Sequence, residues 1–159
     1  MKSPSSLRQA GFTLPELLVA FLLITAVGVA AMFLLHENPR TTERNNYERK
    51  TAEAALIQGI SRYYYDTGSL PDGLTTSYQN IGSESGQYDL CKKLVPDYMY
   101  DMVYDPTSGM VTQDGRCNAK GQKYYTGYSI KQSDNGKSVS IVSTTAEGGK
   151  VILYTKSFK

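Results

Sequence analysis

The first clear feature of the hydropathy pattern is an uninterrupted apolar stretch near the start of the chain. It runs from Phe12 to Leu35 and reads FTLPELLVAFLLITAVGVAAMFLL. As an α-helix, a stretch of this length would extend about 36 Å, which exceeds the roughly 30 Å thickness of a bilayer's hydrocarbon core. The pattern therefore predicts a helix over 12–35 that is long enough to cross a membrane.

Helical spacing returns after this stretch and predicts an amphipathic continuation over 36–66. Pro39 is expected to bend the chain just before itself. Over residues 41–65 an apolar stripe falls near one helix face, and most charged side chains fall elsewhere. The predicted stripe is Tyr47, Thr51, Ala54, Ile57, Ile60 and Tyr64, and the predicted polar set is Arg44, Glu48, Arg49, Glu53 and Arg62. Gly68 and Pro71 are expected to end the helix.

The C-terminal part, 122–159, alternates between apolar and polar side chains in the manner of β-strands. Turns are expected at 134–136 and 147–149, because Asn-Gly and Gly-Gly pairs readily adopt positive φ. The predicted strands are Lys123–Gln132, Ser138–Thr144 and Lys150–Ser157. They would form a small antiparallel sheet whose apolar face needs a cover, and the helix stripe is the candidate.

Residues 67–121, between the helix and the strands, are rich in Gly, Ser, Asp and Asn. They predict a long connection with a short helical piece around Gln87 to Leu94. Asp97, Asp101 and Asp105 recur every four positions. On one helix face these carboxylates would repel each other, so the spacing favours an irregular path.

The only two cysteines, Cys91 and Cys117, lie 26 positions apart and bracket the later half of this connection. An even number in a domain outside the cytoplasm favours one disulfide, and two unpaired buried thiols remain the alternative. A structural zinc site needs about four ligands, whereas the single histidine is His36, beside the apolar stretch. We therefore expect no metal cofactor, except that the oxygen-rich loops leave calcium open.

The charge balance argues against a nucleic-acid partner. The net charge is +2, and Lys2 and Arg8 account for that value before residue 12. The rest of the chain is therefore close to neutral and shows no basic footprint for a specific nucleic acid. The 13 tyrosines, against four phenylalanines and no tryptophan, suggest an exposed module that uses amphipathic rings for contacts.

The apolar stretch carries one charge, Glu16, at a place where an ionised carboxylate is costly unless it is paired. Lys2 and Arg8 precede the stretch, and no acidic residue lies among the first eleven positions. The positive-inside rule therefore predicts a cytoplasmic N-terminus and places the residues after 36 outside.

The segment Gly11-Phe12-Thr13-Leu14-Pro15-Glu16 resembles the start of type IV prepilins and type II secretion pseudopilins. Precursors of this family carry a short basic leader, a glycine, a phenylalanine, and a glutamate as the fifth mature residue. The resemblance covers about the first 25 residues. It implies an α+β, pilin-like fold in which a long N-terminal helix, half transmembrane and half amphipathic, packs on a small C-terminal sheet.

The resemblance also implies how the N-terminus is processed and used. A prepilin peptidase would cut between Gly11 and Phe12 and methylate the new amine of Phe12. The carboxylate of Glu16 would then pair with the Phe12 amine of a neighbouring subunit and set the register between the two, because a buried ion pair is well suited to fixing register. The assembly residues would thus be Phe12, Pro15 and Glu16.

Pro15 departs from the family, which usually has a branched aliphatic residue there. After the cut Pro15 would lie in the first helical turn, where backbone N–H groups have no intrahelical acceptor. The proline would therefore cost no hydrogen bond.

Two simpler interpretations of the N-terminus stay open at this point. A secretory signal peptide also has a basic start and an apolar run, and Val29-Ala30-Ala31 offers small residues near a possible cut, but its apolar run is normally shorter. A plain uncleaved anchor would also fit the length. Neither interpretation explains why the apolar stretch contains an acidic residue, Glu16.

The sequence thus predicts a filament subunit. The expected parts are a cleaved leader (1–11), a transmembrane and polymerisation helix (12–35), its amphipathic continuation (36–66) and an extracytoplasmic head (67–159). The implied partners are prepilin peptidase, copies of itself, other pilin-like subunits, the membrane, and an inner-membrane assembly platform with its ATPase motor. The implied location is the cytoplasmic membrane, and afterwards an extracellular or periplasmic filament.

Two other functions compete with the filament role. A membrane-tethered enzyme finds no support, because the sequence has no Gly-x-Ser-x-Gly elbow, Ser-x-x-Lys motif, zinc spacing or phosphate loop. A monomeric membrane-tethered binding protein that does not polymerise remains the alternative, and it predicts that Glu16 is dispensable.

Overall fold

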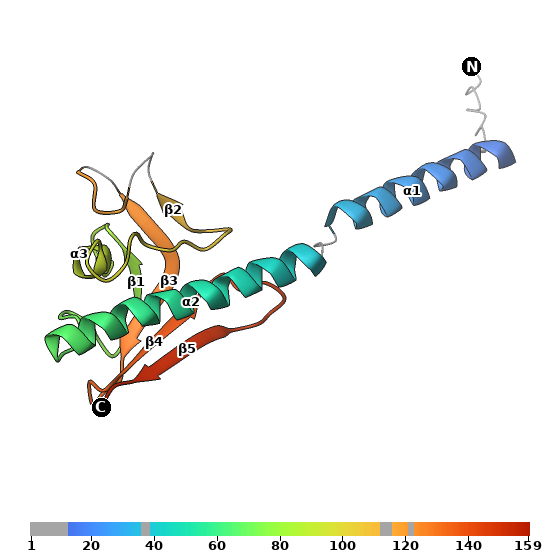
Figure 1. Cartoon of the computed structure of the whole chain (residues 1–159). Helices are drawn as coiled ribbons and strands as arrows, with labels where there is room; N and C mark the ends of the chain where they lie inside the picture. The colour runs from blue at the N-terminus through green and yellow to red at the C-terminus, as the bar shows by residue number, and fades with distance from the viewer. Residues whose placement is uncertain (1–12, 36–38, 112–115, 121–122) are drawn as a thin grey trace, which may run out of the picture. The chain divides into compact units, whose positions relative to one another are not determined.

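The computed structural model describes residues 13–35, 39–111, 116–120 and 123–159. They form two units that divide at residue 38. The first holds the helix α1, and the second, hereafter the C-terminal unit, holds the helices α2 and α3 and five strands (Figure 1).

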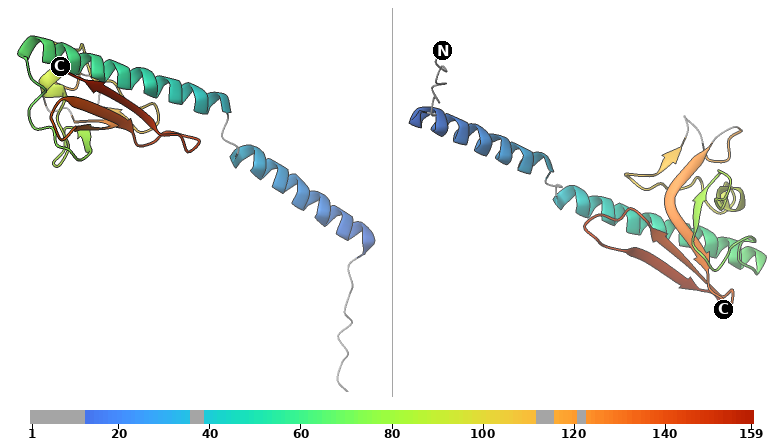
Figure 2. Two further views of the ribbon diagram at one scale, coloured as in Figure 1. Left: turned by 90° about the horizontal axis from the view of Figure 1, so that it is seen from below. Right: turned by 180° about the vertical axis from the view of Figure 1, so that it is seen from behind.

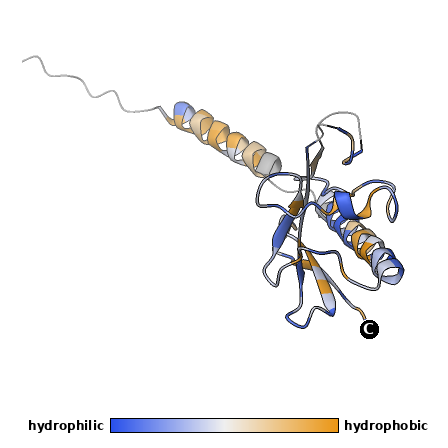
Figure 3. Ribbon diagram, turned by 90° about the vertical axis from the view of Figure 1, so that its left-hand side faces the viewer, coloured by the Kyte–Doolittle hydropathy of each residue, from blue (hydrophilic) through white to orange (hydrophobic). Residues whose placement is uncertain are grey.

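Helix α1 (Leu14–Leu35) has 22 residues and therefore a length of about 33 Å. It lies within the predicted range 12–35. Figure 3 shows that its residues are mostly apolar, and Glu16 is its one charged residue. The helix is long enough and apolar enough to cross a bilayer over Leu14–Met32, a statement of length and composition only.

Helix α2 (Pro39–Thr67) has 29 residues, where the sequence predicted a continuation over 36–66. The start of that range and the bend expected just before Pro39 fall on residues 36–38, outside the described residues. The first residue of α2 is Pro39, where a proline is favoured because its φ suits a helix start and its missing N–H has no intrahelical acceptor. At the other end Gly68 has a φ of 77°, and its N–H donates to the Tyr64 carbonyl oxygen at 2.8 Å. This left-handed glycine ends the helix where the sequence predicted.

The five strands form one antiparallel sheet in the order β1-β3-β4-β5, with β2 also paired to β3. The strands are β1 (Gln79–Gly82), β2 (Met110–Val111), β3 (Tyr124–Gln132), β4 (Ser138–Ser143) and β5 (Ile152–Ser157). Helix α2 lies along one face of the sheet and contacts β4 and β5 (Figures 1 and 2). The predicted α+β arrangement, a long N-terminal helix followed by a small antiparallel sheet, is confirmed.

The three strands expected near the C-terminus, β3, β4 and β5, are present with ends within two residues of the prediction. The turn between β3 and β4 runs through Gly136, whose φ is 64°, as the Asn-Gly pair indicated.

The prediction of a strand-free connection over 67–121 is wrong, because β1 and β2 both lie in it. Both strands are short, and β1 pairs with β3 through an irregularity between Asn80 and Gly82. Strands of four and two residues show no readable alternation, so only the pairing with β3 reveals them. The helical piece predicted around 87–94 is present as α3 (Cys91–Leu94).

The core of the C-terminal unit lies between α2, the sheet and the connection. Its fully buried side chains come from all three: Leu56 and Ile60 from α2, Ile81, Leu90 and Leu94 from the connection, and Tyr128, Ile130, Val139 and Ile141 from β3 and β4. The connection is therefore a third layer of the core as well as a link.

The predicted buried face of α2 is partly wrong. Tyr47, expected in the apolar stripe, is 71% exposed, whereas Arg49 and Glu53, expected outside it, are 0% and 1% exposed. The buried residues of α2 recur with helical spacing, but in the first half of the helix they lie on a different face from the predicted stripe. That half has few apolar residues that would favour burial of the predicted face. Polar partners from other elements, described below, decide burial there.

Candidate functional site

The residues that begin α1 hold the candidate assembly segment. Thr13 precedes the helix, and its carbonyl oxygen accepts a bond from the Leu17 N–H at 3.1 Å. Both the N–H and the hydroxyl of Thr13 donate to Oε2 of Glu16, each at 3.3 Å. This is one half of a capping box, in which an acidic residue at the third helical position reaches back to the residue that caps the helix.

Glu16 is thus held beside the N-terminal end of α1. Unpaired backbone N–H groups make this end partly positive, so a carboxylate is favoured there. Glu16 is among the residues predicted from the sequence, whereas Thr13 is not. The Thr-x-x-Glu spacing before an apolar run is the signal that would have found it.

Pro15 is the second residue of α1. It lies in the first turn, where backbone N–H groups have no intrahelical acceptor, so the proline removes no intrahelical hydrogen bond here. Gly11 and Phe12, between which the cut is predicted, lie outside the described residues.

The body of α1 presents apolar side chains to its surroundings on all sides. Large side chains such as Leu14, Phe21 and Ile24 are each more than 60% exposed within the structure. The hydroxyl of Thr25 bonds to the Phe21 and Leu22 carbonyl oxygens at 3.0 and 2.9 Å, so this polar group is satisfied by the helix itself. Such a surface is suited to lipid or to other apolar helices.

A family model described as the prokaryotic N-terminal methylation motif matches residues 6–32. The match includes the predicted cut site, Glu16 and most of α1. The motif marks a type IV prepilin-like protein. No curated protein and no solved structure matches this prepilin-like chain. Its motif and its apolar helix together suggest membrane anchoring.

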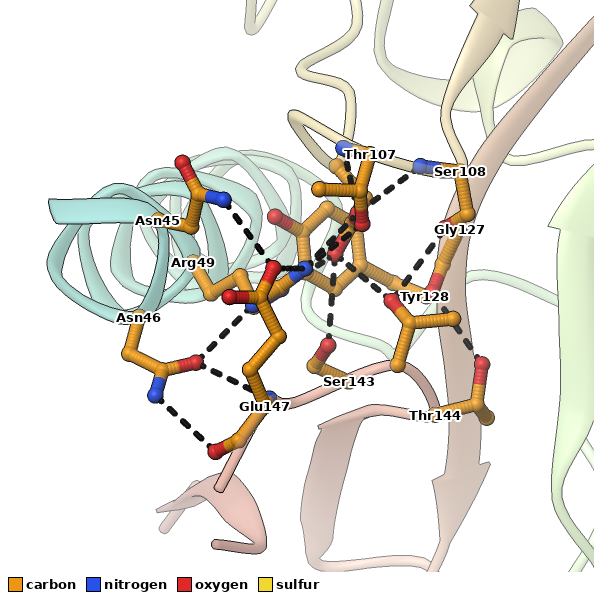
Figure 4. A network of polar contacts seen from close by, with 12 residues as sticks. Asn45, Asn46, Arg49, Thr107, Ser108, Gly127, Tyr128, Ser143, Thr144 and Glu147 are labelled. Carbon is orange, nitrogen blue, oxygen red and sulfur yellow. Dashed lines mark hydrogen bonds and ion pairs between the residues drawn. The ribbon is translucent and has the colours of Figure 1, made fainter. Parts of the chain in front are cut away.

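The C-terminal unit of the prepilin-like protein is organised around a buried ion pair. Arg49 of α2 donates from Nε to Oδ2 of Asp105 at 2.7 Å and from Nη2 to Oδ1 at 3.3 Å, and neither side chain has exposed surface. Arg49 also donates to Asn46 (2.9 Å), to Thr107 (2.7 Å) and to Glu147 (3.4 Å). Figure 4 shows how these partners surround the guanidinium group.

Asp105 connects the 105–108 loop and the turn between β4 and β5 to Arg49. Its carboxylate accepts bonds from the backbone N–H groups of Thr107 and Ser108 at 2.9 and 3.0 Å and from the Thr145 hydroxyl at 2.9 Å. Burial alone would raise the pKa of Asp105, but these donors and Arg49 hold it well below its usual range. The same contacts raise the pKa of Arg49 despite its burial. The pair is therefore fully ionised at neutral pH.

The turn between β4 and β5 joins the network through Glu147. The Asn45 side-chain amide donates to Oε1 of Glu147 at 3.0 Å, and the Asn46 amide donates to the Glu147 carbonyl oxygen at 3.2 Å. The Asn45 bond, followed by Thr42 and Arg49, lowers the pKa of Glu147. Arg49, Asp105 and their partners, hereafter the Arg49 network, thus connect α2, the 105–108 loop, β4 and the β4–β5 turn.

Gly127 of β3 makes room for this network. Its φ is 83°, and a Cβ atom at this position would lie 2.5 Å from Cβ of Asp105 and 2.6 Å from the Ser108 hydroxyl oxygen. Any side chain would therefore collide with the loop that carries Asp105.

The predicted disulfide is present. Cys91 and Cys117 are bonded, with their Cα atoms 6.2 Å apart. The N–H of Cys91 donates to the Tyr124 hydroxyl at 3.0 Å, which in turn donates to Asp89 at 2.9 Å. The disulfide therefore joins α3 to residue 117, which follows Asp105 in the sequence. The bond to Tyr124 holds α3 beside the start of β3.

The described residues offer no metal-binding constellation. They include no group of three or more His, Cys, Asp or Glu side chains that could hold a metal ion. Asp97, Asp101 and Asp105 follow an irregular path, as the spacing favoured, and they do not converge. Asp101 instead accepts bonds from the backbone N–H groups of Met102 and Cys117, at 2.7 and 3.1 Å.

Proposed function

We propose that this chain is a structural subunit of a type IV pilus-like filament or of a type II secretion pseudopilus. The observation that carries the proposal is the methylation motif over 6–32 with Glu16 as the single charge of α1. The motif implies processing by a prepilin peptidase and assembly with other pilin subunits.

The chemistry of the start of α1 supports an assembly role for Glu16. A cut after Gly11 creates an α-amino group on Phe12 whose ordinary pKa is about 7.7 to 8.0, so much of it is protonated near neutral pH. An ionised Glu16 is costly in an apolar helix bundle unless it meets a cation. The Phe12 amine of a neighbouring subunit supplies one, and the contact fixes the register between two helices.

The alternative contact for Glu16 is internal. Thr13 occupies Oε2 of Glu16 through two bonds of 3.3 Å, which are long for bonds to a carboxylate. These bonds orient the carboxylate at the helix start without supplying a compensating charge. A neighbouring amine therefore complements the arrangement, because it adds the missing positive charge.

The proposed arrangement places the N-terminus in the cytoplasm before processing and the C-terminal unit outside. The role is structural and not enzymatic, in keeping with a motif family that is structural. The inner-membrane platform and its ATPase motor would drive assembly.

Mass spectrometry of the N-terminus tests the proposal. The chain, expressed with a prepilin peptidase, is expected to begin at an N-methylated Phe12. A Gly11→Leu variant, whose branched side chain occupies the cut site, is expected to keep all eleven leader residues.

Two other results would contradict the proposal. A chain that begins after Ala31 would indicate a secretory signal peptide. A wild-type chain that keeps its leader in the presence of the peptidase would indicate a plain anchor.

A further inference from the structure

Glu53 is a buried carboxyl group that the Arg49 network does not include. It lies one helical turn after Arg49 on α2, and only 1% of the residue is exposed. Among the described residues, the backbone N–H of Ser143 in β4 is its polar partner from another element. Its Oε1 atom is buried without a hydrogen-bond partner among the described residues. A charged carboxylate in this position is poorly compensated.

The buried cation one helical turn before Glu53, Arg49, is already engaged. Arg49 directs its donors to Asp105, Asn46, Thr107 and Glu147. Two carboxylates, Asp105 and Glu147, already face this single guanidinium. A third negative charge at Glu53 would add to a region where two carboxylates already share one cation.

In the part of the chain that the structure describes, the other elements around Glu53 bring no compensating charge. From β3 comes Tyr128, which is fully buried and whose hydroxyl also has no partner among the described residues. β4 offers the Ser143 N–H, and β5 places the apolar Ile152 opposite Ser143. Burial is the first cause that raises the pKa of Tyr128, followed by the charges of Asp105 and Glu53. The tyrosine is therefore a neutral neighbour.

From this geometry we infer that Glu53 is a proton-binding site, neutral when α2 is seated on the sheet, so that proton uptake from the medium stabilises the C-terminal unit. Burial raises the pKa of Glu53 to about 7, against an ordinary value of 4.5, and the Ser143 N–H offsets only part of this effect. The carboxyl group therefore titrates near neutral pH.

The direction of the pH effect follows from the two protonation states. Below about pH 4.5, Glu53 is protonated in both the folded and the unfolded chain and contributes no difference. Between 4.5 and about 7 the unfolded chain releases this proton while the folded chain keeps it, so stability falls as pH rises. Asp105 acts in the opposite direction, because its lowered pKa makes stability fall only in acid, below about pH 4. The C-terminal unit should be most stable in a mildly acidic medium.

Denaturant unfolding of the full chain in detergent micelles measures this effect. All 13 tyrosines lie at position 47 or later, so the near-ultraviolet circular dichroism of tyrosine reports on the C-terminal unit. Between pH 5 and pH 8 the unfolding equilibrium constant of the wild type is expected to rise on the order of tenfold to a hundredfold. A Glu53→Gln variant should lose most of this rise.

A Glu48→Gln variant is the matched control, because Glu48 lies on the same helix with half of its side chain exposed. It should keep the rise of the wild type. A Glu53→Gln variant that shows the same rise as the wild type would overturn the inference.

A second measurement on the wild type covers the case in which Glu53→Gln fails to fold. The 13C chemical shift of the Glu53 side-chain carboxyl, followed against pH, gives its titration midpoint directly. A midpoint above about pH 6 supports the inference, and a midpoint below about pH 6 contradicts it.

Discussion

Arg49 carries a full positive charge to a position where its side chain has no exposed surface. Transfer of a guanidinium group out of water is costly, and the cost is offset here by bonds to four residues from three parts of the chain. Removal of one partner leaves the charge buried, so individual members of the Arg49 network should be far less replaceable than the whole network.

Replacement of Asp105 tests this dependence. Asp105→Asn keeps the size of the side chain but removes the charge that faces Arg49. We expect the free energy of unfolding to fall by about 3 to 5 kcal/mol, as for other buried ion pairs that lose one partner. Denaturant titration of the full chain in micelles at pH 7 measures the loss.

An exposed aspartate of the same connection, Asp97, supplies the control. Asp97→Asn should change the free energy of unfolding by less than about 0.5 kcal/mol. The double variant Arg49→Met with Asp105→Leu should recover most of the stability, because it removes both charges together. Equal losses for Asp105→Asn and Asp97→Asn would show that the ion pair does not hold the unit together.

Among the elements, those with local signals were predictable. Alternation over several residues and Asn-Gly or Gly-Gly turns identified β3, β4 and β5, and Gly68 identified the end of α2. The apolar length identified α1. Each of these signals lies within the element itself or directly beside it.

Elements defined by distant contacts were not predictable. β1 and β2 exist because β3 offers them a pairing edge. The buried face of α2 depends on Asp105 and Glu147, which lie 56 and 98 positions after Arg49. From sequence, a charged residue is predicted to be exposed unless its buried partner is known. No local sequence pattern identifies that partner.

The disulfide acts at the scale of the connection between α2 and β3. It closes the segment 91–117, which includes the loop that carries Asp105. On the loop-entropy account, a closed loop of this length stabilises the folded chain by about 3 to 4 kcal/mol. A Cys91→Ser, Cys117→Ser double variant should lose about this amount, measured by thermal unfolding in the near-ultraviolet.

Reduced wild-type chain provides the comparison, and its unfolding midpoint should match that of the double variant. A double variant that unfolds at the same temperature as the oxidised wild type would show that other contacts, such as those of Asp101 and Tyr124, suffice to hold the connection.

The whole molecule divides into a unit that exposes apolar surface and a unit with its own core. Substitutions in the start of α1 should therefore act on assembly and leave the C-terminal unit intact. Glu16→Leu is expected to reduce filament yield on the order of tenfold or more, because the neighbouring Phe12 amine would then be buried without a partner. Electron microscopy of sheared filaments measures the yield.

Near-ultraviolet unfolding of the same Glu16→Leu chain should give the wild-type midpoint. Thr25→Val is the control within α1, since the Thr25 hydroxyl bonds only to its own helix, and it should assemble normally. Normal filaments from Glu16→Leu would refute the proposed contact, and a monomeric tethered protein would then be the better description.

The absence of a side chain at Gly127 has a consequence for related sequences. A mutation at this position would force the Asp105 loop outward and leave Arg49 without its carboxylate. Lineages should therefore either keep glycine, aspartate and arginine together or lose all three. When homologous chains are compared, correlated replacement at positions 49, 105 and 127 would mark the branches in which other contacts replaced this buried ion pair.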